Sequence, residues 1–597
     1  MQDHRVSLQN LKSRLSYVAE WRQSTGWGAT FHENALRLPF FLPEFESEVW
    51  KSEYTVNDRS LPEYKLKPVD LENAEIRLVE LFPSPKRYGE IRCRIFHVLL
   101  DSNPVYDSVS YASKLIDTIG YIRANGLLLP LPSAVIESLR NVRAKGGTRG
   151  RVLFLWDIMW EPDIYLFGWK LRLNYRIFKQ AQQVAIGLGG DDREKDHCAI
   201  EFVREFESML ASGGATAEFS TNMLTRSHKN SSNSLGNALL QLFQRPWWRR
   251  IWPVHELVLP RKATLSYGDE AITFDGIQTL FSNQQAIRNL IGDWEFSMLE
   301  SNLAWRGAQR ISLLRAHYLL GHHLTLPELL WAIDFHNSSD RSDSLYAIYG
   351  LLEPEEQDSK IFTQDPHKSV EENFIDVAVY IVNRYQNLDI LSYASHHRPV
   401  QPSLPSWVPV FSVAGDDVYP LVQSTFGPPG ATSMFNAGGI KSDHPVLAGD
   451  FRSLIVRGYQ FDEVQTLFRA SDDAESRSSL LDLYTAVKQR TKITPEIFWG
   501  TVQADQRDNH RIGKANAMTD PALRQDGSPE SGFCKGRRLV LTLEGHLCFA
   551  PGSSQMGDKI VVLVGGKVPY MLRKMADGFK VIGEWFVCPD RQARTWY

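Results

Sequence analysis

Between about residue 75 and residue 210, short apolar runs alternate with amphipathic helical patterns, and this order constrains the fold more than any other feature of the sequence. Residues 75–81 and 91–98 alternate apolar with polar side chains, so they predict two paired strands. The runs at 151–156 and 183–188 are almost continuously apolar, which is typical of strands buried on both faces of a sheet. Together with a helix predicted at 132–142, they indicate an α/β domain, a mixed sheet with flanking helices.

The remainder of the chain divides by composition into regions of different character. Capping boxes at Thr325–Glu328 and Ser369–Glu372 predict helix starts, and the last part of the chain contains four apolar runs separated by Gly-rich turns. The sequence therefore predicts an α/β domain followed by a helical middle region and a β-rich C-terminal region. The boundaries expected are an N-terminal extension at 1–74, the α/β domain at 75–257, helices at 258–410, a loop or linker at 411–449 and β structure at 450–597.

Charge and cysteine usage exclude several classes of protein. The 66 basic and 70 acidic residues give a net charge of −4, which provides no general attraction for nucleic acid or for an anionic membrane. The five cysteines are scattered singly, which argues against a disulfide framework and a cysteine-rich zinc site. No apolar window is long enough to span a membrane. The composition favours a soluble cytoplasmic protein without a membrane span, whose N-terminal helix at about residues 8–21 packs on its own core.

Several local patterns resemble ligand sites but lack the required spacing. The glycines at 187–190 match neither a dinucleotide fingerprint nor a P-loop, because Asp191 and Asp192 place negative charge where a phosphate would bind. The histidines at 317–323 have no carboxylate at metal-ligand spacing, so no metal is predicted. Residues 244–256 interleave arginines with tryptophans, a composition that fits base stacking or a packed corner; with the net charge of −4, the packed corner is favoured and no nucleic-acid partner is predicted.

The same segment carries a family resemblance. Arg245-Pro-Trp-Trp-Arg-Arg-Ile-Trp252 followed by Glu256 resembles the R-P-W-F-x-R-x-W-x-x-Q-E signature of the fungal heterokaryon-incompatibility (HET) domain, of which the chain is identified as a divergent member. Other stretches resemble the family's motifs in the same order: Ile76-Arg-Leu-Val-Glu-Leu81, Tyr106-Asp-Ser-Val-Ser-Tyr111, the stretch ending in Gly189, Leu404-Pro-Ser-Trp-Val-Pro409 and several C-terminal pairs. The motif residues of the α/β domain are Tyr106, Ser110, Tyr111, Trp156, Asp157, Gly189, Arg245, Pro246, Trp247, Arg250, Trp252 and Glu256.

Departures from the family pattern bear on mechanism. Where the family has W-I-D-A-I-C-I-N-Q, this chain reads Leu155-Trp-Asp-Ile-Met-Trp-Glu-Pro-Asp163 and keeps only Asp157 of that polar set. The E-R pair that follows in the family falls on Leu166 and Phe167. HET domains resemble TIR domains, some of which cleave NAD with a glutamate, so the resemblance implies that such chemistry would need another carboxylate here. Asp157, Glu161 and Glu256 are the weak catalytic candidates; turn capping for Asp157 and an ion pair with Arg249 or Arg250 for Glu256 are the structural alternatives.

The resemblance implies a signalling or cell-death effector in fungal non-self recognition, acting through protein partners and without a cofactor, whose active site is degenerate. An active NAD-cleaving enzyme that uses Asp157 or Glu161, with NAD as its substrate, is the alternative. A third reading is a purely structural adaptor that forms stable complexes.

Overall fold

The chain is described from a computed structural model, in which two compact units are formed by Met1–Leu319 with Tyr346–Asn373 and by Leu320–Leu345 with Phe374–Tyr597. Each unit is described by itself below. The structure describes residues 61–86, 88–112, 119–143, 150–159, 167–189, 193–211, 235–267, 270–322, 324–333, 343–357, 359, 361, 368–394, 403–411, 437–439, 445–468, 484–489, 491, 493–502, 506–507, 510–511 and 537–587.

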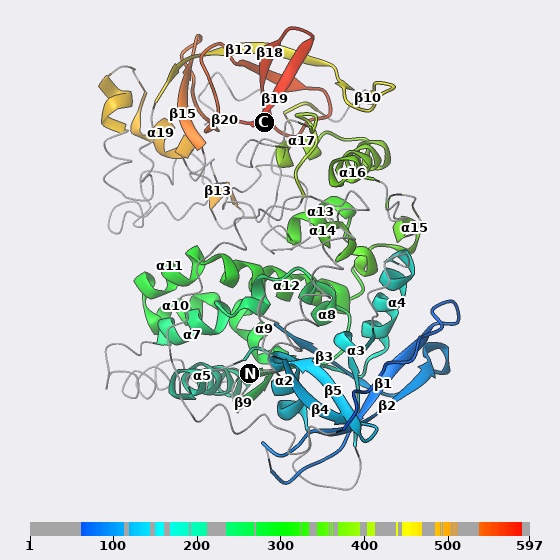
Figure 1. The fold of residues 1–597 in the computed structure, drawn as a ribbon. Helices are drawn as coiled ribbons and strands as arrows, with labels where there is room; N and C mark the ends of the chain where they lie inside the picture. The colour runs from blue at the N-terminus through cyan, green and yellow to red at the C-terminus, as the bar shows by residue number, and fades with distance from the viewer. Residues whose placement is uncertain are drawn as a thin grey trace, which may run out of the picture. The chain divides into compact units, whose positions relative to one another are not determined.

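The first unit is built on a nine-stranded mixed sheet with the order β5-β4-β2-β1-β6-β3-β7-β8-β9 (Figure 1). Its centre is parallel, because β3 pairs in parallel with β6 and β7, and β7 pairs in parallel with β8. Antiparallel pairs, β1 with β2 and β6, β4 with β5, and β8 with β9, extend the sheet on both sides. The strands are β1 (Glu75–Leu81), β2 (Arg92–Leu99), β3 (Asp107–Tyr111), β4 (Ile119–Ala124), β5 (Leu127–Pro132), β6 (Arg151–Leu155), β7 (Val184–Gly187), β8 (Ala263–Tyr267) and β9 (Glu270–Thr273).

The predicted α/β pattern is confirmed at each strong signal, with strand ends shifted by one or two residues. The predicted helix at 132–142 is α2 (Ser133–Val142), and its buried face joins Val109, Tyr111 and Leu155 in one hydrophobic cluster. Because side chains alternate along a strand, Ser108 and Ser110 face the opposite side of the sheet. The central strand β3 therefore presents apolar side chains to α2 and hydroxyl groups to the other face.

Two strand pairs were not predicted. The hairpin of β4 and β5 turns at Asn125-Gly126, where both residues have positive φ (51° and 85°), a dipeptide that favours tight hairpin turns. The strands β8 and β9 lie within the region for which helices are predicted, and they complete the far edge of the first sheet. The Asn-Gly dipeptide could have predicted the first hairpin. The place of β8 in the sheet depends instead on its parallel pairing with β7, for which the local sequence carries no signal.

Helices of the first unit pack beside this sheet, and α7 and α9 to α12 lie together in one group (Figure 1). The helix predicted after Asp191-Asp192 is α5, and Phe202, Phe206 and Met209 are buried as expected. The helical elements are η3 (Leu100–Ser102), α2 (Ser133–Val142), α3 (Trp156–Met159), α4 (Phe167–Gln180), α5 (Arg193–Ala211), α7 (Leu235–Phe243), η4 (Pro246–Arg249), α8 (Pro253–Val258), α9 (Phe274–Ser282), α10 (Gln284–Ile291), α11 (Asp293–Ser301), α12 (Leu303–Leu319), η5 (Tyr349–Leu351) and α15 (Pro354–Gln357).

The second unit contains the predicted β-rich region as a seven-stranded sheet with the order β19-β18-β17-β12-β15-β16-β20. Every pair in it is antiparallel, and the side chains of Val540, Met571 and Trp585 belong to one buried core cluster. The strands of this unit are β10 (Val446–Leu447), β11 (Leu454–Ile455), β12 (Gly458–Leu467), β13 (Gln506–Arg507), β14 (His510–Arg511), β15 (Arg537–Thr542), β16 (Leu547–Pro551), β17 (Lys559–Leu563), β18 (Tyr570–Met575), β19 (Gly578–Glu584) and β20 (Phe586–Val587).

Both predicted capping boxes are confirmed. Glu328 accepts hydrogen bonds from the backbone N–H and the hydroxyl of Thr325 (both 2.8 Å), and Glu372 does the same for Ser369 (2.7 and 2.9 Å). The two boxes lie at the N-termini of α13 and α16. The helices of this part of the chain are α13 (Leu326–Ala332), α14 (Asp343–Tyr346), α16 (Val370–Tyr385), α17 (Ile390–Tyr393) and α19 (Pro495–Val502). The boundaries between the two units fall after Leu319 at the end of α12, within α14 and within α16.

Some expectations lie outside the described residues. These are the N-terminal helix at about residues 8–21 and most of the 411–449 linker. Among the helices that are described, none combines the length and the apolar character needed to cross a membrane. The predicted domain boundaries stay predictions.

Candidate functional site

The carboxyl ends of three adjacent parallel strands meet at one edge of the first sheet. The strands β6, β3 and β7 end at Leu155, Tyr111 and Gly187. In the sheet, β3 lies between β6 and β7, although β3 comes before both of them in the sequence. In open α/β sheets, such a reversal of strand order at the carboxyl edge is where ligands usually bind. A ligand site formed by the motif residues is therefore expected at this edge.

The hydroxyl of Ser110 is the centre of a polar cluster at this edge. Ser110 Oγ donates a hydrogen bond to the Glu256 carboxylate and accepts one from Trp247 Nε1 at 2.7 Å. Arg250 donates to the backbone carbonyl of Tyr111, the next residue of β3. We call Ser110, Trp247, Arg250 and Glu256 the serine–glutamate cluster. It joins the end of the central strand to η4 and α8, which are more than 130 residues away in sequence.

The environment of Glu256 perturbs its acidity. Burial raises the pKa of the Glu256 carboxyl, and the Arg250 charge and the Ser110 hydrogen bond oppose this effect only in part. Glu256 as a whole residue is half-buried. Ser110 is only 2% exposed, and its hydroxyl donates to Glu256 and accepts from Trp247. Both polar valences of the Ser110 hydroxyl are thus engaged within the cluster. The sequence offered an ion pair with Arg249 or Arg250 as the structural alternative for Glu256, and in the structure the charge of Arg250 acts on this carboxyl.

Replacing Glu256 by glutamine should reduce the dependence of stability on pH. A carboxyl with a raised folded-state pKa binds a proton more tightly in the folded protein, so it stabilises the fold at low pH and loses that contribution as pH rises through the folded pKa. Glutamine can still accept the Ser110 hydrogen bond. The melting temperature of Glu256→Gln minus that of wild type should therefore be larger at neutral pH than at pH 4. Scanning calorimetry of both proteins at the two pH values measures this difference.

The exposed carboxylate of Asp101, with 70% of its side chain accessible, provides the matched control. Asp101→Asn should leave the difference between acidic and neutral pH close to that of wild type. Identical pH profiles for Glu256→Gln and wild type would contradict a raised pKa of the Glu256 carboxyl in the folded protein.

A buried histidine next to Glu256 is held neutral. His255 Nδ1 donates to the Ala347 carbonyl at 3.2 Å, and because that acceptor requires an N–H, Nε2 accepts from Asn174 Nδ2 at 2.7 Å. Burial lowers the pKa of His255 to about 4, opposed by the Ala347 hydrogen bond. With both ring nitrogens engaged and the ring 5% exposed, His255 fixes α8 against α4 and is poorly placed to transfer protons to a substrate.

Two tryptophans lie beside the cluster. Trp156, the first residue after β6, is 36% exposed, and its ring centroid is 6.3 Å from that of Trp252 at an angle of 33°. Trp252 precedes Glu256 by one helical turn and makes an edge contact with His255 at 5.4 Å. The aromatic pair therefore connects the end of β6 to the start of α8.

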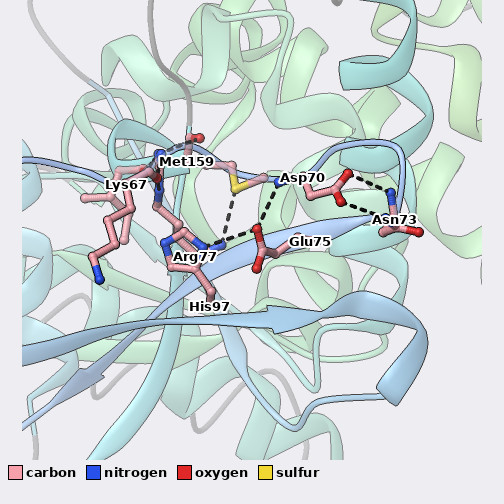
Figure 2. Close-up of polar contacts among 8 residues, drawn as sticks. Lys67, Asp70, Asn73, Glu75, Arg77, His97 and Met159 are labelled. Atoms are coloured by element: carbon pink, nitrogen blue, oxygen red, sulfur yellow. Dashed lines mark hydrogen bonds and ion pairs between the residues drawn. The ribbon is translucent and has the colours of Figure 1, made fainter.

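The turn of helix after β6 is fixed by a buried arginine of β1 (Figure 2). Arg77 is fully buried, and its guanidinium donates to the carbonyls of Ile158 (2.8 Å), Met159 (3.0 Å) and Lys67 (3.0 Å). Its backbone N–H approaches Met159 Sδ at 3.4 Å. Figure 2 also shows Glu75 accepting a hydrogen bond from the Asp70 N–H at 2.9 Å, in the loop that leads into the strand. Arg77 thus positions α3, the segment that contains Trp156 and Asp157.

A second buried arginine fixes the C-terminal end of α8. Arg315 of α12 donates to the carbonyls of Leu257, Pro260 (2.6 Å) and Arg261 (2.8 Å), where the helix and the following turn have no internal donors. Burial lowers the pKa of Arg315 to about 10, with Asp275 opposing. Like Arg77, this residue positions the site without belonging to it.

The structure brings only part of the predicted site residues together. Ser110, Trp247, Arg250 and Glu256 converge, Tyr111 and Trp252 adjoin them, and Trp156 contacts Trp252. Tyr106 is buried at the other end of β3, where its hydroxyl donates to Ile177 O at 2.6 Å and burial raises its pKa. Arg245 precedes η4, Pro246 is its first residue, and Gly189 follows β7 with φ of 72°. The side chain of Asp157 and all of Glu161 lie outside the described part of the chain.

Sequence reasoning missed several residues that support this edge. Arg77 stood within a quoted motif but was not considered for a role, and His255 lies one residue before Glu256 in the quoted segment. Asn174 and Arg315 carried no recognisable signal, because their partners are backbone carbonyls and a histidine far away in sequence. Within the described ranges, no group of three or more His, Cys, Asp or Glu side chains is arranged to hold a metal ion.

Comparison with known proteins bears on the second unit. Residues 504–589 match the model of the Het-6 beta-barrel domain family. That range contains every strand of the seven-stranded sheet except β12, which lies in the middle of the sheet between β17 and β15. No curated protein and no solved structure matches the chain significantly. The match suggests a HET-related protein.

Proposed function

We propose that this chain is a heterokaryon-incompatibility-type protein that acts through protein partners as a signalling or cell-death effector in fungal non-self recognition. The Het-6 barrel match to residues 504–589 supports the incompatibility role. The ordered motifs of the α/β domain support it independently, since Ser110, Trp247 and Glu256 come from two separate motifs and meet in space.

We further propose that the α/β unit acts as a scaffold without nucleotide chemistry. The observation that carries this proposal is the serine–glutamate cluster, in which Ser110 is buried and its hydroxyl bridges Glu256 and Trp247. A carboxylate that accepts a hydrogen bond from a hydroxyl of β3 in this way stabilises the junction of β3 with α8. Leu166 and Phe167, at the positions of the family's E-R pair, provide no polar group to assist it.

A second candidate function is favoured by one observation. Glu256 is a half-buried residue whose carboxyl has a pKa raised by burial, at the carboxyl edge of parallel strands, an environment in which catalytic acids and bases are often found. This would permit cleavage of NAD, with Glu256, Asp157 or Glu161 as the essential carboxylate.

A single assay separates the two. Purified full-length protein is incubated with NAD and nicotinamide release is followed; the scaffold proposal expects no release above a protein-free blank, for wild type as for Glu256→Gln and Asp157→Asn. In parallel, expression in fungal cells should reduce viability equally for wild type and Glu256→Gln. Turnover by wild type that either substitution abolishes would contradict the scaffold proposal, and unchanged viability would contradict the effector role.

A further inference from the structure

The first residues of β12 extend beyond the core of the second unit. Gly458, Tyr459 and Gln460 are all exposed, although alternate residues of a strand point to opposite faces, so both faces of the strand are open here. The Tyr459 side chain is 72% exposed. Figure 1 shows β12 as a long strand that runs toward the hairpin containing β10.

One backbone edge of this segment is also open. Val564 N–H donates to Arg457 O at 2.9 Å, which makes Arg457 and Val564 a hydrogen-bonded pair of the antiparallel ladder between β12 and β17. Because such pairs alternate, Tyr459 bonds toward β17, whereas Gly458 and Gln460 direct their N–H and C=O groups away from it.

The neighbouring strand on that side begins too late to satisfy these groups. The pairing of β15 with β12 starts at Val464, and Glu463 O accepts the Leu543 N–H at 3.0 Å. A register shift after Gln460 separates the two parts of the strand. Among the described residues, none pairs with Gly458 or Gln460 on this edge.

We propose that this edge is the contact through which two copies of the chain form a symmetric dimer. In an antiparallel pairing centred on Tyr459, Gly458 lies opposite Gln460 of the second copy, and both are the residues whose backbone groups point outward. The two equivalent pairs make four backbone hydrogen bonds. Tyr459 then lies opposite Tyr459 of the second copy in the close, non-hydrogen-bonded position, where aromatic cross-strand pairs stabilise a sheet.

The side chains around the edge suit a second copy. Arg457 is the only charged residue in 457–461, and the pairing places it opposite Phe461 of the second copy, so like charges do not meet. Val446 and Ile455, a cross-strand pair that is 56% and 61% exposed, add apolar surface in the hairpin that precedes β12 in the chain. Because the strand segment is short, the buried area is small and the dimer is expected to be weak and concentration-dependent. This contact is independent of the proposed function.

Sedimentation velocity of the full chain tests the contact. Over about a hundredfold range of concentration, the weight-average sedimentation coefficient of wild type should rise toward that of a dimer. Tyr459→Lys, which places like charges opposite each other, and Gln460→Pro, which removes an outward N–H without a ladder bond to β17, should each remove the rise. Phe579→Lys, at a 55% exposed residue of β19, is the matched control and should associate like wild type.

The register is tested by cross-linking. Tyr459→Cys should form an inter-chain disulfide under mild oxidation, because the two side chains are adjacent at the symmetry axis, whereas Phe579→Cys and wild type should stay monomeric on non-reducing gels. A wild-type sedimentation coefficient that does not change with concentration would overturn the proposal. So would association that survives both Tyr459→Lys and Gln460→Pro, with unchanged melting temperatures confirming that the variants are folded.

Discussion

Replacing Arg77 by methionine should destabilise the first unit by about 3 kcal/mol or more, since hydrogen bonds from a charged donor contribute about 1.5–3 kcal/mol each. Methionine keeps an apolar stem of similar length but leaves the carbonyls of Ile158, Met159 and Lys67 without their buried donor. Urea unfolding followed by intrinsic fluorescence measures the loss. Hydrogen-exchange mass spectrometry should locate it to residues 156–159, because α3 is the element that the guanidinium holds.

Arg94→Met is the matched control for this change. Arg94 lies on the adjacent strand β2, is 61% exposed in its side chain and pairs with Glu80 at 2.8 Å. An exposed ion pair of this kind contributes about 0–1 kcal/mol. If the two variants lose the same stability, the buried guanidinium does not have the positioning role described for it.

Replacing Glu584 by glutamine should destabilise the second unit by about 3–5 kcal/mol, the usual cost of breaking a buried ion pair from one side. Arg537 and Glu584 form an ion pair in which each side chain is 1% exposed. They belong to β15 and β19, which are separated by three strands in the sheet order, so their contact shows that the sheet curls. The pair therefore fixes the curvature of the region that matches the Het-6 barrel family. Differential scanning calorimetry measures the change.

The double variant Arg537→Met/Glu584→Leu should recover part of that loss, because apolar side chains remove the buried charge altogether. Glu463→Gln serves as the control, since its pair with Lys559 is more exposed (31% and 20%) and should cost about 1 kcal/mol or less. A double variant as unstable as Glu584→Gln would indicate that packing at these positions, and not the uncompensated arginine, sets the cost.

Local sequence signals predicted much of the secondary structure. The strands at 75–81 and 151–155, the helix α2 and the capping boxes of α13 and α16 depend on side-chain periodicity and on contacts within four residues. The hairpin of β4 and β5 was missed although Asn125-Gly126 marks its turn. The parallel addition of β8 to β7 has no local signal, because parallel partners are distant in sequence.

The candidate site was predictable only as a set of residue names. The motifs placed Ser110, Trp247 and Glu256 among the residues to consider, but nothing in the sequence indicated that one hydroxyl would bridge the other two. Their convergence follows from the parallel order of β6, β3 and β7, which brings the end of β3 beneath α8. The roles of Arg77 and Arg315 could not be predicted from the sequence either, because each binds carbonyls of elements that are distant in the chain.

The sequence by itself determined the class of the elements with a strong side-chain period and the order of α/β, helical and β-rich regions, because these depend on which side chains recur at the period of a helix or a strand. Only the tertiary structure decided which residues share the carboxyl edge, how far Glu256 is removed from water and which part of β12 remains open. Those properties depend on distances between segments far apart in the chain, and burial and electrostatic energy change steeply with such distances.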